Sequence, residues 1–136
     1  MRILFLVIII NCFNLSVFSQ LGLRIEFNKL HDNKGFIEVD FRDGDEKFIK
    51  GITEKVSDKK CTIILDSLKA GNYAFKYFHD VNSNKKLDTN WIGIPKEGFG
   101  FSNDAKVMFG PPPFKNTIFK LHADTVIYCE PIYLEF

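Results

Sequence analysis

The sequence carries almost no excess of charge of either sign. Its 136 residues include 18 lysines and arginines against 17 aspartates and glutamates, so the formal net charge is +1 at pH 7. Proteins that bind nucleic acid or an anionic membrane electrostatically usually show a clear basic excess. The composition therefore predicts no nucleic-acid partner and no electrostatic footprint for an anionic membrane.

The sequence also lacks an apolar run long enough to cross a bilayer. Residues 3–10 are uninterrupted apolar, whereas a spanning helix needs about 20 such residues. Arg2 precedes the run, and residues 17–19 (VFS) resemble a cleavage site, which is the layout of a secretory signal. We predict that residues 1–19 are a cleaved leader. Residues 20–136 then form a single domain with no net charge and no membrane insertion.

Cysteine is scarce. Of three cysteines, Cys12 lies in the predicted leader, so only Cys61 and Cys129 remain after export. An exported protein meets an oxidising compartment, and both residues lie in expected strands. Two interpretations stay open. The pair forms a disulfide across the sandwich, which requires Cα atoms within ~7 Å, or the two thiols are buried as small hydrophobic side chains.

Catalytic motifs are missing as well. The sequence has no Gly-x-Ser-x-Gly elbow and no glycine-rich loop that precedes a helix and could hold a phosphate. Its three histidines, His31, His79 and His122, show no metal-ligand spacing. His79 and Asp80 are adjacent in an expected strand, so their side chains point to opposite faces. These observations predict a protein that is not an enzyme.

Alternating apolar residues are the clearest pattern present. Residues 21–27 (LGLRIEF) and 37–41 (IEVDF) each place an apolar residue at every second position. Strict alternation is the signature of a half-buried strand. The polar cluster at residues 31–35 (HDNKG) is typical of a turn. We therefore predict two strands joined as a β-hairpin.

The middle of the chain is less regular. The charged segment 43–60 does not sustain the period of a long helix, and its apolar residues are expected to cover a sandwich edge with a short turn of helix: Phe48, Ile49 and Ile52. Residues 61–65 (CTIIL) predict another strand. An aromatic strand follows in residues 73–79 (YAFKYFH). We expect the stripe on one of its faces to lie in the core: Tyr73, Phe75, Tyr77 and His79.

Residues 91–102 are too rich in glycine and proline to predict regular structure. Gly98 and Gly100 are interpreted as loop glycines, because no helix follows them. The bulky apolar residues of this segment are expected to pack it against the sandwich: Trp91, Ile92, Ile94, Phe99 and Phe101. A loop of this length in a compact domain is usually functional or mobile.

The end of the chain predicts further strands. Residues 107–109 are expected to form a short one, and residues 117–121 and 126–134 a closing hairpin. Pro131 places the last strand at an edge or a bulge, because proline cannot donate to a ladder. About seven short strands without a long helix predict an all-β, antiparallel sandwich of the immunoglobulin or transthyretin type over residues 20–136.

Oxygen-bearing side chains recur at the first, third, fifth and ninth positions of a loop that follows the aromatic strand: Asp80, Asn82, Asn84 and Asp88. Calcium prefers six to eight oxygen ligands at about 2.3–2.6 Å. The backbone carbonyl of Lys86 would fill the seventh position, and Glu97 or Asp104 would complete the shell. We therefore expect a weak calcium site, in the range of about 10⁻⁴–10⁻³ M.

The same loop has a simpler interpretation. Asn and Asp side chains bond their own backbone and tolerate left-handed conformations, so an Asx-rich turn needs no ion. Two positions depart from a standard calcium loop: Lys85 stands where glycine makes the sharp turn, and Trp91 stands where a glutamate would close the site.

Four strings of the sequence resemble the secreted bacterial family called domain of unknown function 2141: residues 71–73 (GNY), 79–88 (HDVNSNKKLD), 93–102 (GIPKEGFGFS) and 111–114 (PPPF). The resemblance runs from about Leu21 to the end of the chain. It implies export and a compact β-domain and brings no established activity. The turn and the Asp/Asn loop are also similar to transthyretin-like and calcium-binding B-type repeat domains at the level of fold.

From these patterns we expect a non-catalytic extracytoplasmic binding module that is secreted, periplasmic or on the cell surface. Its working surface would be residues 80–102, and its ligand an unidentified protein or carbohydrate. Two alternatives remain. One is a structural cell-envelope protein that self-associates through an edge strand near Pro131. The other is a hydrolase that uses two of Asp80, Asp88 and Glu97.

Overall fold

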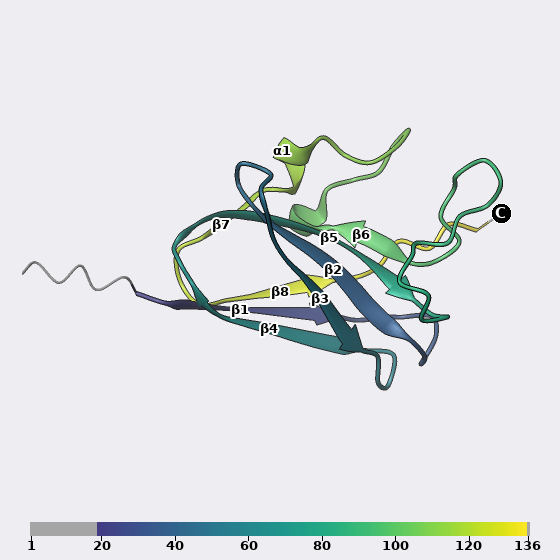
Figure 1. The fold of residues 1–136 in the computed structure, drawn as a ribbon, viewed down its shortest axis with the longest axis horizontal. Coiled ribbons are helices and arrows are strands. Elements are labelled where there is room, and N and C mark those ends of the chain that lie inside the picture. The colour runs from purple at the N-terminus through teal and green to yellow at the C-terminus, as the bar shows by residue number, and fades with distance from the viewer. Residues whose placement is uncertain (1–18, 136) are drawn as a thin grey trace, which may run out of the picture.

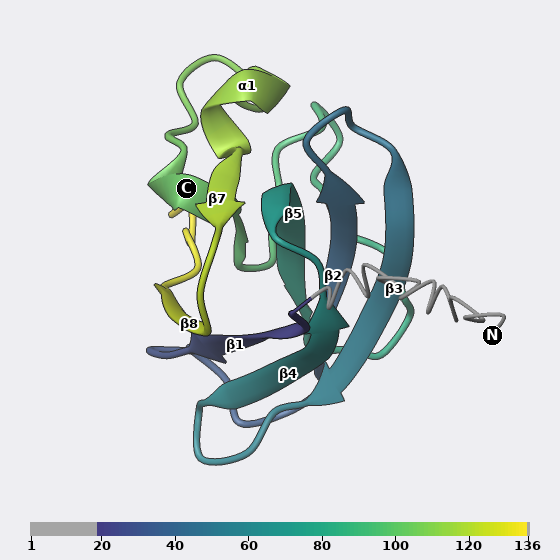
Figure 2. The same cartoon turned by 90° about the vertical axis from the view of Figure 1, so that its left-hand side faces the viewer.

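The computed structural model describes residues 19–135, which form two packed β-sheets (Figures 1 and 2). The elements in chain order are β1 (Leu21–Phe27), β2 (Phe36–Asp43), β3 (Phe48–Lys55), β4 (Cys61–Leu68), β5 (Gly71–Asp80), β6 (Phe99–Phe101), a short 3-10 helix (Ser102–Asp104), α1 (Phe114–Thr117), β7 (Phe119–Leu121) and β8 (Thr125–Cys129). The predicted leader lies outside the described residues except for Ser19. Within residues 19–135 no helix is long and apolar enough to cross a membrane.

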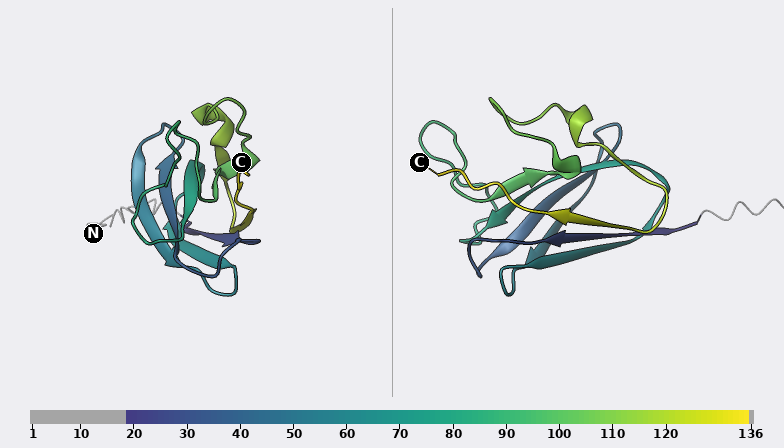
Figure 3. Two further views of the ribbon diagram at one scale, coloured as in Figure 1. Left: turned by 90° about the vertical axis from the view of Figure 1, so that its right-hand side faces the viewer. Right: turned by 180° about the vertical axis from the view of Figure 1, so that it is seen from behind.

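The two sheets differ in size and in strand direction. The small sheet has the order β4-β1-β8, and the large sheet has the order β3-β2-β5-β6, with β7 also paired to β5. All pairs are antiparallel except β1 with β8, which run parallel side by side in the rear view (Figure 3). The described part of the chain is therefore the predicted all-β sandwich, with eight strands and one parallel pair.

The core lies between the sheets and follows the predicted alternation. In β1 the inward side chains of Leu23, Ile25 and Phe27 are fully buried. The aromatic stripe of β5 faces them, and the ring centroids of Phe27 and Tyr77 lie 4.7 Å apart in an edge-to-face contact. Burying each such side chain stabilises the fold by about 1.5–3 kcal/mol. The stripe is core, as predicted.

The predicted hairpin between residues 21–27 and 37–41 is wrong. β1 pairs with β4 and β8, whereas β2 pairs with β3 and β5, so the two strands lie in different sheets. The connection between them is fixed to the sandwich by Leu30, which is buried and donates its backbone N–H to Lys59 O at 3.2 Å. Alternation identifies a strand and its buried face, but it does not identify the partner.

The irregular segment 43–60 contains a strand instead of a turn of helix. β3 is an edge strand, and only Ile52 in it packs against the core. A strand exposed on both faces needs no alternation, which explains why its sequence looks irregular. Charged side chains such as Lys50 and Lys55 are typical of edge strands, because they discourage pairing with another chain.

The C-terminal predictions need two corrections. Residues 107–109 form no strand. The expected hairpin of residues 117–121 and 126–134 does not form either, because β7 pairs with β5 and β8 pairs with β1, so the chain crosses from one sheet to the other. β8 is an edge strand and ends at Cys129, before Pro131, which agrees with the inability of proline to donate to a ladder.

Cys61 and Cys129 are both free and buried. In the small sheet each lies opposite Phe27, one on either side, so they are two strands apart. Two strand spacings are about 9–10 Å, beyond the reach of a disulfide. Burial raises the pKa of each thiol to about 12, with a further contribution from Glu54 at Cys61 and from Asp104 at Cys129. The structure therefore supports the second interpretation, in which Cys61 and Cys129 are buried free thiols.

Candidate functional site

Asp80 ends β5 and starts the connection that leads to β6. Its carboxylate is completely buried and accepts two backbone N–H groups, from Asn84 at 3.1 Å and from Lys85 at 2.8 Å. These bonds fold the chain into a tight turn in which Ser83 and Lys85 both have a φ near +60°. That conformation costs a residue other than glycine about 1–2 kcal/mol, and the bonds to the charged acceptor offset this cost.

The oxygen-bearing side chains of the loop converge on Asp88. The amide nitrogens of Asn82 and Asn84 both donate to its carboxylate, the latter at 2.9 Å. The amide oxygen of Asn82 accepts the backbone N–H of Asn84 at 3.2 Å, and that of Asn84 accepts the N–H of Lys86 at 2.9 Å. The loop is thus a network of Asx-type hydrogen bonds. Two amide nitrogens meet at the Asp88 carboxylate, while the amide oxygens and the Asp80 carboxylate face backbone N–H groups.

Glu97 joins this loop from the far side of the connection. Its side chain is only 8% exposed, and its two carboxylate oxygens accept the backbone N–H groups of Val81 at 3.0 Å and of Asp88 at 3.1 Å. The backbone N–H of Lys96 adds a bond to Asp88 O at 2.8 Å. One carboxylate therefore clamps both ends of the loop. The structure brings Glu97 to the loop, as predicted, but turns it toward backbone amides.

The fit of the loop to a cation is limited. Within residues 19–135 no group of three or more His, Cys, Asp or Glu side chains could hold a metal ion. The loop offers the carboxylates of Asp80 and Asp88, two amide groups and backbone oxygens, and its present hydrogen bonds already occupy those carboxylates. Asp104, the other candidate ligand, lies in the 3-10 helix, where its charge raises the pKa of Cys129.

His79 anchors the base of the connection. Its ring is fully buried, and Nε2 lies 2.8 Å from the carbonyl oxygen of Lys34, so this nitrogen carries the proton. Nδ1 then accepts the hydroxyl of Tyr133 at 3.0 Å, and the Tyr133 ring stacks on His31 at a centroid distance of 3.6 Å. The expected packing role of His79 is confirmed. Sequence reasoning missed Tyr133, since no periodicity or spacing links it to residue 79.

Residues 99–101 of the Gly-Phe-Gly-Phe string form strand β6, so Gly100 is not a loop glycine, whereas Gly98 lies just before the strand. β6 pairs with β5, and a side chain on Gly98 would clash with the Tyr133 ring, while one on Gly100 would clash with the Tyr77 ring. The two glycines therefore let these tyrosine rings pack directly against the backbone. Phe99 is buried and Phe101 is half-buried, with their ring centroids 6.5 Å apart.

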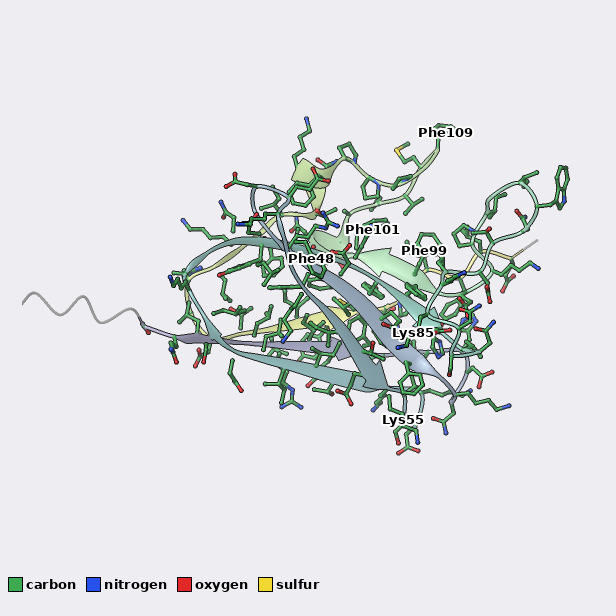
Figure 4. The ribbon with its side chains drawn as sticks, viewed as in Figure 1. Phe48, Lys55, Lys85, Phe99, Phe101 and Phe109 are labelled. Carbon is green, nitrogen blue, oxygen red and sulfur yellow. The ribbon has the colours of Figure 1, made fainter. Side chains whose placement is uncertain are left out.

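An open groove of about 390 Å³ lies on the outer face of the large sheet. Phe99 and Phe101 of β6 line it together with Leu87 of the loop. Phe48 of β3 and Phe78 of β5 also contribute to its walls. Figure 4 labels Phe48, Phe99 and Phe101 in this region. A groove of this volume and aromatic content falls within the size range of small-molecule sites.

The tip of the connection, residues 90–94, differs from the buried base in its exposure to solvent. Trp91 is 94% exposed and Ile92 is also exposed, so the prediction that both pack against the sandwich is wrong. The tip is a local turn, in which Asn90 Oδ1 accepts the backbone N–H groups of Ile92 at 3.1 Å and Ile94 at 2.9 Å. Local hydrogen bonds thus order the turn without any contact that would bury its apolar side chains.

Comparison with known proteins places the same elements within one family. The model of the family described as "Uncharacterized protein conserved in bacteria (DUF2141)" matches residues 25–128. This range covers nearly all of both sheets and the whole connection from Asp80 to Ser102. No curated protein and no solved structure matches the chain.

Proposed function

The chain belongs to this family of uncharacterized bacterial proteins, and we propose that it is a non-catalytic, extracytoplasmic binding module whose working surface is the connection from Asp80 to Ser102. One observation carries the proposal. The base of the connection is clamped by the buried carboxylates of Asp80 and Glu97, while its outer residues line a groove and project from the fold. A rigid support that displays a loop is the usual arrangement of a binding site.

The groove supports a ligand with both apolar and polar surface, such as a sugar or a peptide. Aromatic side chains offer flat apolar faces for such a ligand, and Phe99 and Phe101 lie beside the charged groups of Asp40 and Lys76. The arrangement of the carboxylates in this region does not support a catalytic role in the same way. Both oxygens of Asp80 and of Glu97 accept backbone N–H groups and are buried, so neither carboxylate is presented to a substrate.

Calcium is proposed as a weak ligand of the loop base. The convergence of Asn82, Asn84 and Asp88 supports it, because rotation of the two amide groups would turn their oxygens toward the position that their nitrogens now occupy. The carbonyl of Lys86 and the carboxylate of Asp80 would add oxygens. Few carboxylates and two neighbouring lysines predict a dissociation constant of about 10⁻³ M.

Thermal unfolding with and without calcium tests the calcium site. At about ten times the dissociation constant, calcium would stabilise the native state by about 1.4 kcal/mol, which raises Tm by about 5 °C for a domain of this size. The variant Asp88→Ala should remove the rise. Asp66→Ala, which deletes an exposed carboxylate in β4, should retain it. No shift at about 10 mM calcium, or an equal shift in both variants, would overturn the site.

The working surface is tested separately by screening soluble glycans and peptides against the ¹⁵N-labelled chain. Amide shifts should cluster at β6, at Leu87 and along the facing residues of β2 and β5. Binding should weaken in Phe101→Ala, which opens one wall of the groove, and persist in Ile64→Ser on the outer face of the small sheet. Shifts that cluster on the small sheet would show that the working surface is elsewhere.

A further inference from the structure

Two loops of the molecule share a sequence pattern at their outer tips. In each, two bulky apolar residues precede a glycine with positive φ: Trp91-Ile92-Gly93, with φ +86°, and Met108-Phe109-Gly110, with φ +147°. A side-chain atom added at either glycine would meet nothing within 4 Å among the described residues beyond its chain neighbours. Both apexes therefore stand clear of the fold. We call Trp91, Ile92, Met108 and Phe109 the apolar tips.

Three of the four apolar tips, Trp91, Met108 and Phe109, are the most exposed large apolar side chains among residues 19–135. Trp91, Met108 and Phe109 are almost fully exposed, and Ile92 is more than half exposed. The two loops rise on the same side of the molecule in Figures 1 and 3, and Phe109 lies at the outer end of its loop in Figure 4. Single exposed apolar residues are ordinary, but four on two adjacent projections mark an interaction surface.

Exposed lysines lie in both loops that carry the apolar tips, although the chain as a whole is nearly neutral. Residues 85–115, which contain both tips, carry five lysines and three acidic residues. The lysines are all exposed. Lys96 follows the first tip by a few residues and Lys106 precedes the second, whereas Lys85 lies at the base of its loop (Figure 4). Of the acidic residues, Glu97 is buried and clamps backbone amides. The side of the molecule that bears the tips therefore presents ammonium groups beside exposed apolar side chains.

We propose that the apolar tips dock this protein on a lipid bilayer that contains anionic phospholipids. The tips enter the interfacial region, and the surrounding lysines contact the headgroup phosphates. Tryptophan favours this region because its indole is both apolar and a hydrogen-bond donor, and each nearby lysine adds attraction to an anionic surface. The inference rests on the proposed function, since Trp91 and Ile92 belong to its working surface, and it names a bilayer as a partner of that surface.

The shape of the tips favours a bilayer over a protein partner. Each tip is convex and projects alone, so a protein would need two separate pockets at a fixed spacing to cover both. A bilayer interface accepts both projections without such pockets. The docking is peripheral, because within residues 19–135 no helix is long and apolar enough to cross a membrane.

The test uses Trp91, the only tryptophan of the chain, as its own reporter. The purified chain is mixed, in EDTA, with vesicles of phosphatidylglycerol and phosphatidylcholine in equal amounts, or of phosphatidylcholine alone. We expect the chain to float with the first vesicles, the emission of Trp91 to shift to shorter wavelength, and lipids brominated in their acyl chains to quench it. Binding to phosphatidylcholine alone should be about tenfold weaker.

Variants separate docking from other causes of binding. Phe109→Ser should weaken vesicle binding by about tenfold, and Trp91→Ser with Phe109→Ser by about a hundredfold. Tyr128→Ser is the matched control, because it removes an exposed aromatic side chain on the small sheet, and it should bind as the parent does. Absence of flotation, an unshifted Trp91 emission, or equal losses in Tyr128→Ser would each overturn the proposal. Dimers that Trp91→Ser disrupts in the absence of lipid would identify the tips as a self-association surface and also overturn it.

The outcome is distinguishable from a failure of the proposed function. EDTA removes any calcium contribution, so vesicle binding does not depend on the loop base. If the vesicles fail and a soluble glycan or peptide shifts the amides of β6, the working surface stands and the bilayer is not its partner. If the vesicles bind and no soluble ligand shifts those amides, lipid docking stands and the groove loses its assigned role.

Discussion

The base and the tip of one connection behave in opposite ways. At the base, the buried carboxylates of Asp80 and Glu97 each accept two backbone N–H groups. At the tip, Trp91 is almost fully exposed, and only hydrogen bonds within the turn itself, to the side chain and backbone of Asn90, order it. Two charged residues of the connection are thus buried while its tryptophan is exposed, the reverse of the usual preference of these residue types. The difference separates residues that hold the loop from residues that are free to bind.

Glu97→Ala should have the largest effect, because it should loosen the base of the connection and remove its difference from the tip. The substitution leaves the backbone N–H groups of Val81 and Asp88 without their acceptor, and bonds to a charged acceptor contribute about 1.5–3 kcal/mol each. We expect the free energy of unfolding to fall by about 3 kcal/mol, measured by urea denaturation. Glu97→Gln keeps one acceptor oxygen and should lose about half as much. A loss below about 1 kcal/mol in Glu97→Ala would show that the clamp contributes little.

Gly100→Ala should disturb the support beneath the connection. An added methyl group would meet the Tyr77 ring, which cannot move freely because it packs in the core. Overpacking of this kind costs about 1–3 kcal/mol, and denaturant unfolding should detect it. Gly51→Ala in β3 of the same sheet is the control, since its new atom would approach only Val39 O at 4.0 Å. Equal effects in the two variants would contradict the close tyrosine packing.

Lys85→Gly should strengthen the base instead of weakening it. Lys85 has a φ of +61°, a conformation that costs a lysine about 1–2 kcal/mol and glycine almost nothing. After subtraction of the extra chain entropy of glycine, we expect a gain of about 0.5–1 kcal/mol in the free energy of unfolding. Lys86→Gly is the matched control and should give no gain. A destabilised Lys85→Gly would indicate that its side chain supports the turn.

Trp91→Ser should have the smallest effect on the fold. The side chain is exposed, so its loss should change the free energy of unfolding by less than about 0.5 kcal/mol. Phe99→Ser, in the buried part of the same connection, is the contrasting variant and should cost about 3 kcal/mol or more. Chemical denaturation of both variants checks the difference. Comparable losses would mean that the tip is packed in solution.

The sequence predicts most of the sandwich, because alternation reports directly which face of a strand is buried. The strands at residues 21–27 and 73–79 and the core stripe of Tyr73, Phe75 and Tyr77 follow from it. Strand partners do not, since pairing depends on how connections cross between the sheets, as β1 and β2 show. The sequence does not predict β3, because an edge strand that is exposed on both faces has no apolar alternation.

The candidate site is less predictable. The spacing of Asp80, Asn82, Asn84 and Asp88 correctly indicates that their polar groups gather in one loop, but spacing cannot tell whether they face an ion or backbone amides. Glu97 reaches that loop from nine residues beyond Asp88, a contact that no local pattern reports. The exposure of Trp91 is also invisible in the sequence, because composition alone favours burial of a bulky apolar side chain.

Hydrogen exchange of the chain with and without phosphatidylglycerol vesicles, followed by mass spectrometry, tests most directly whether an anchored base displays a binding tip. Peptides that contain residues 80–88 should exchange slowly in both states, because buried carboxylates hold their amides. Peptides that contain residues 91–93 and 107–110 should exchange rapidly in the free chain and slowly with vesicles. Rapid exchange at residues 80–88, or protection confined to the small sheet, would contradict the account.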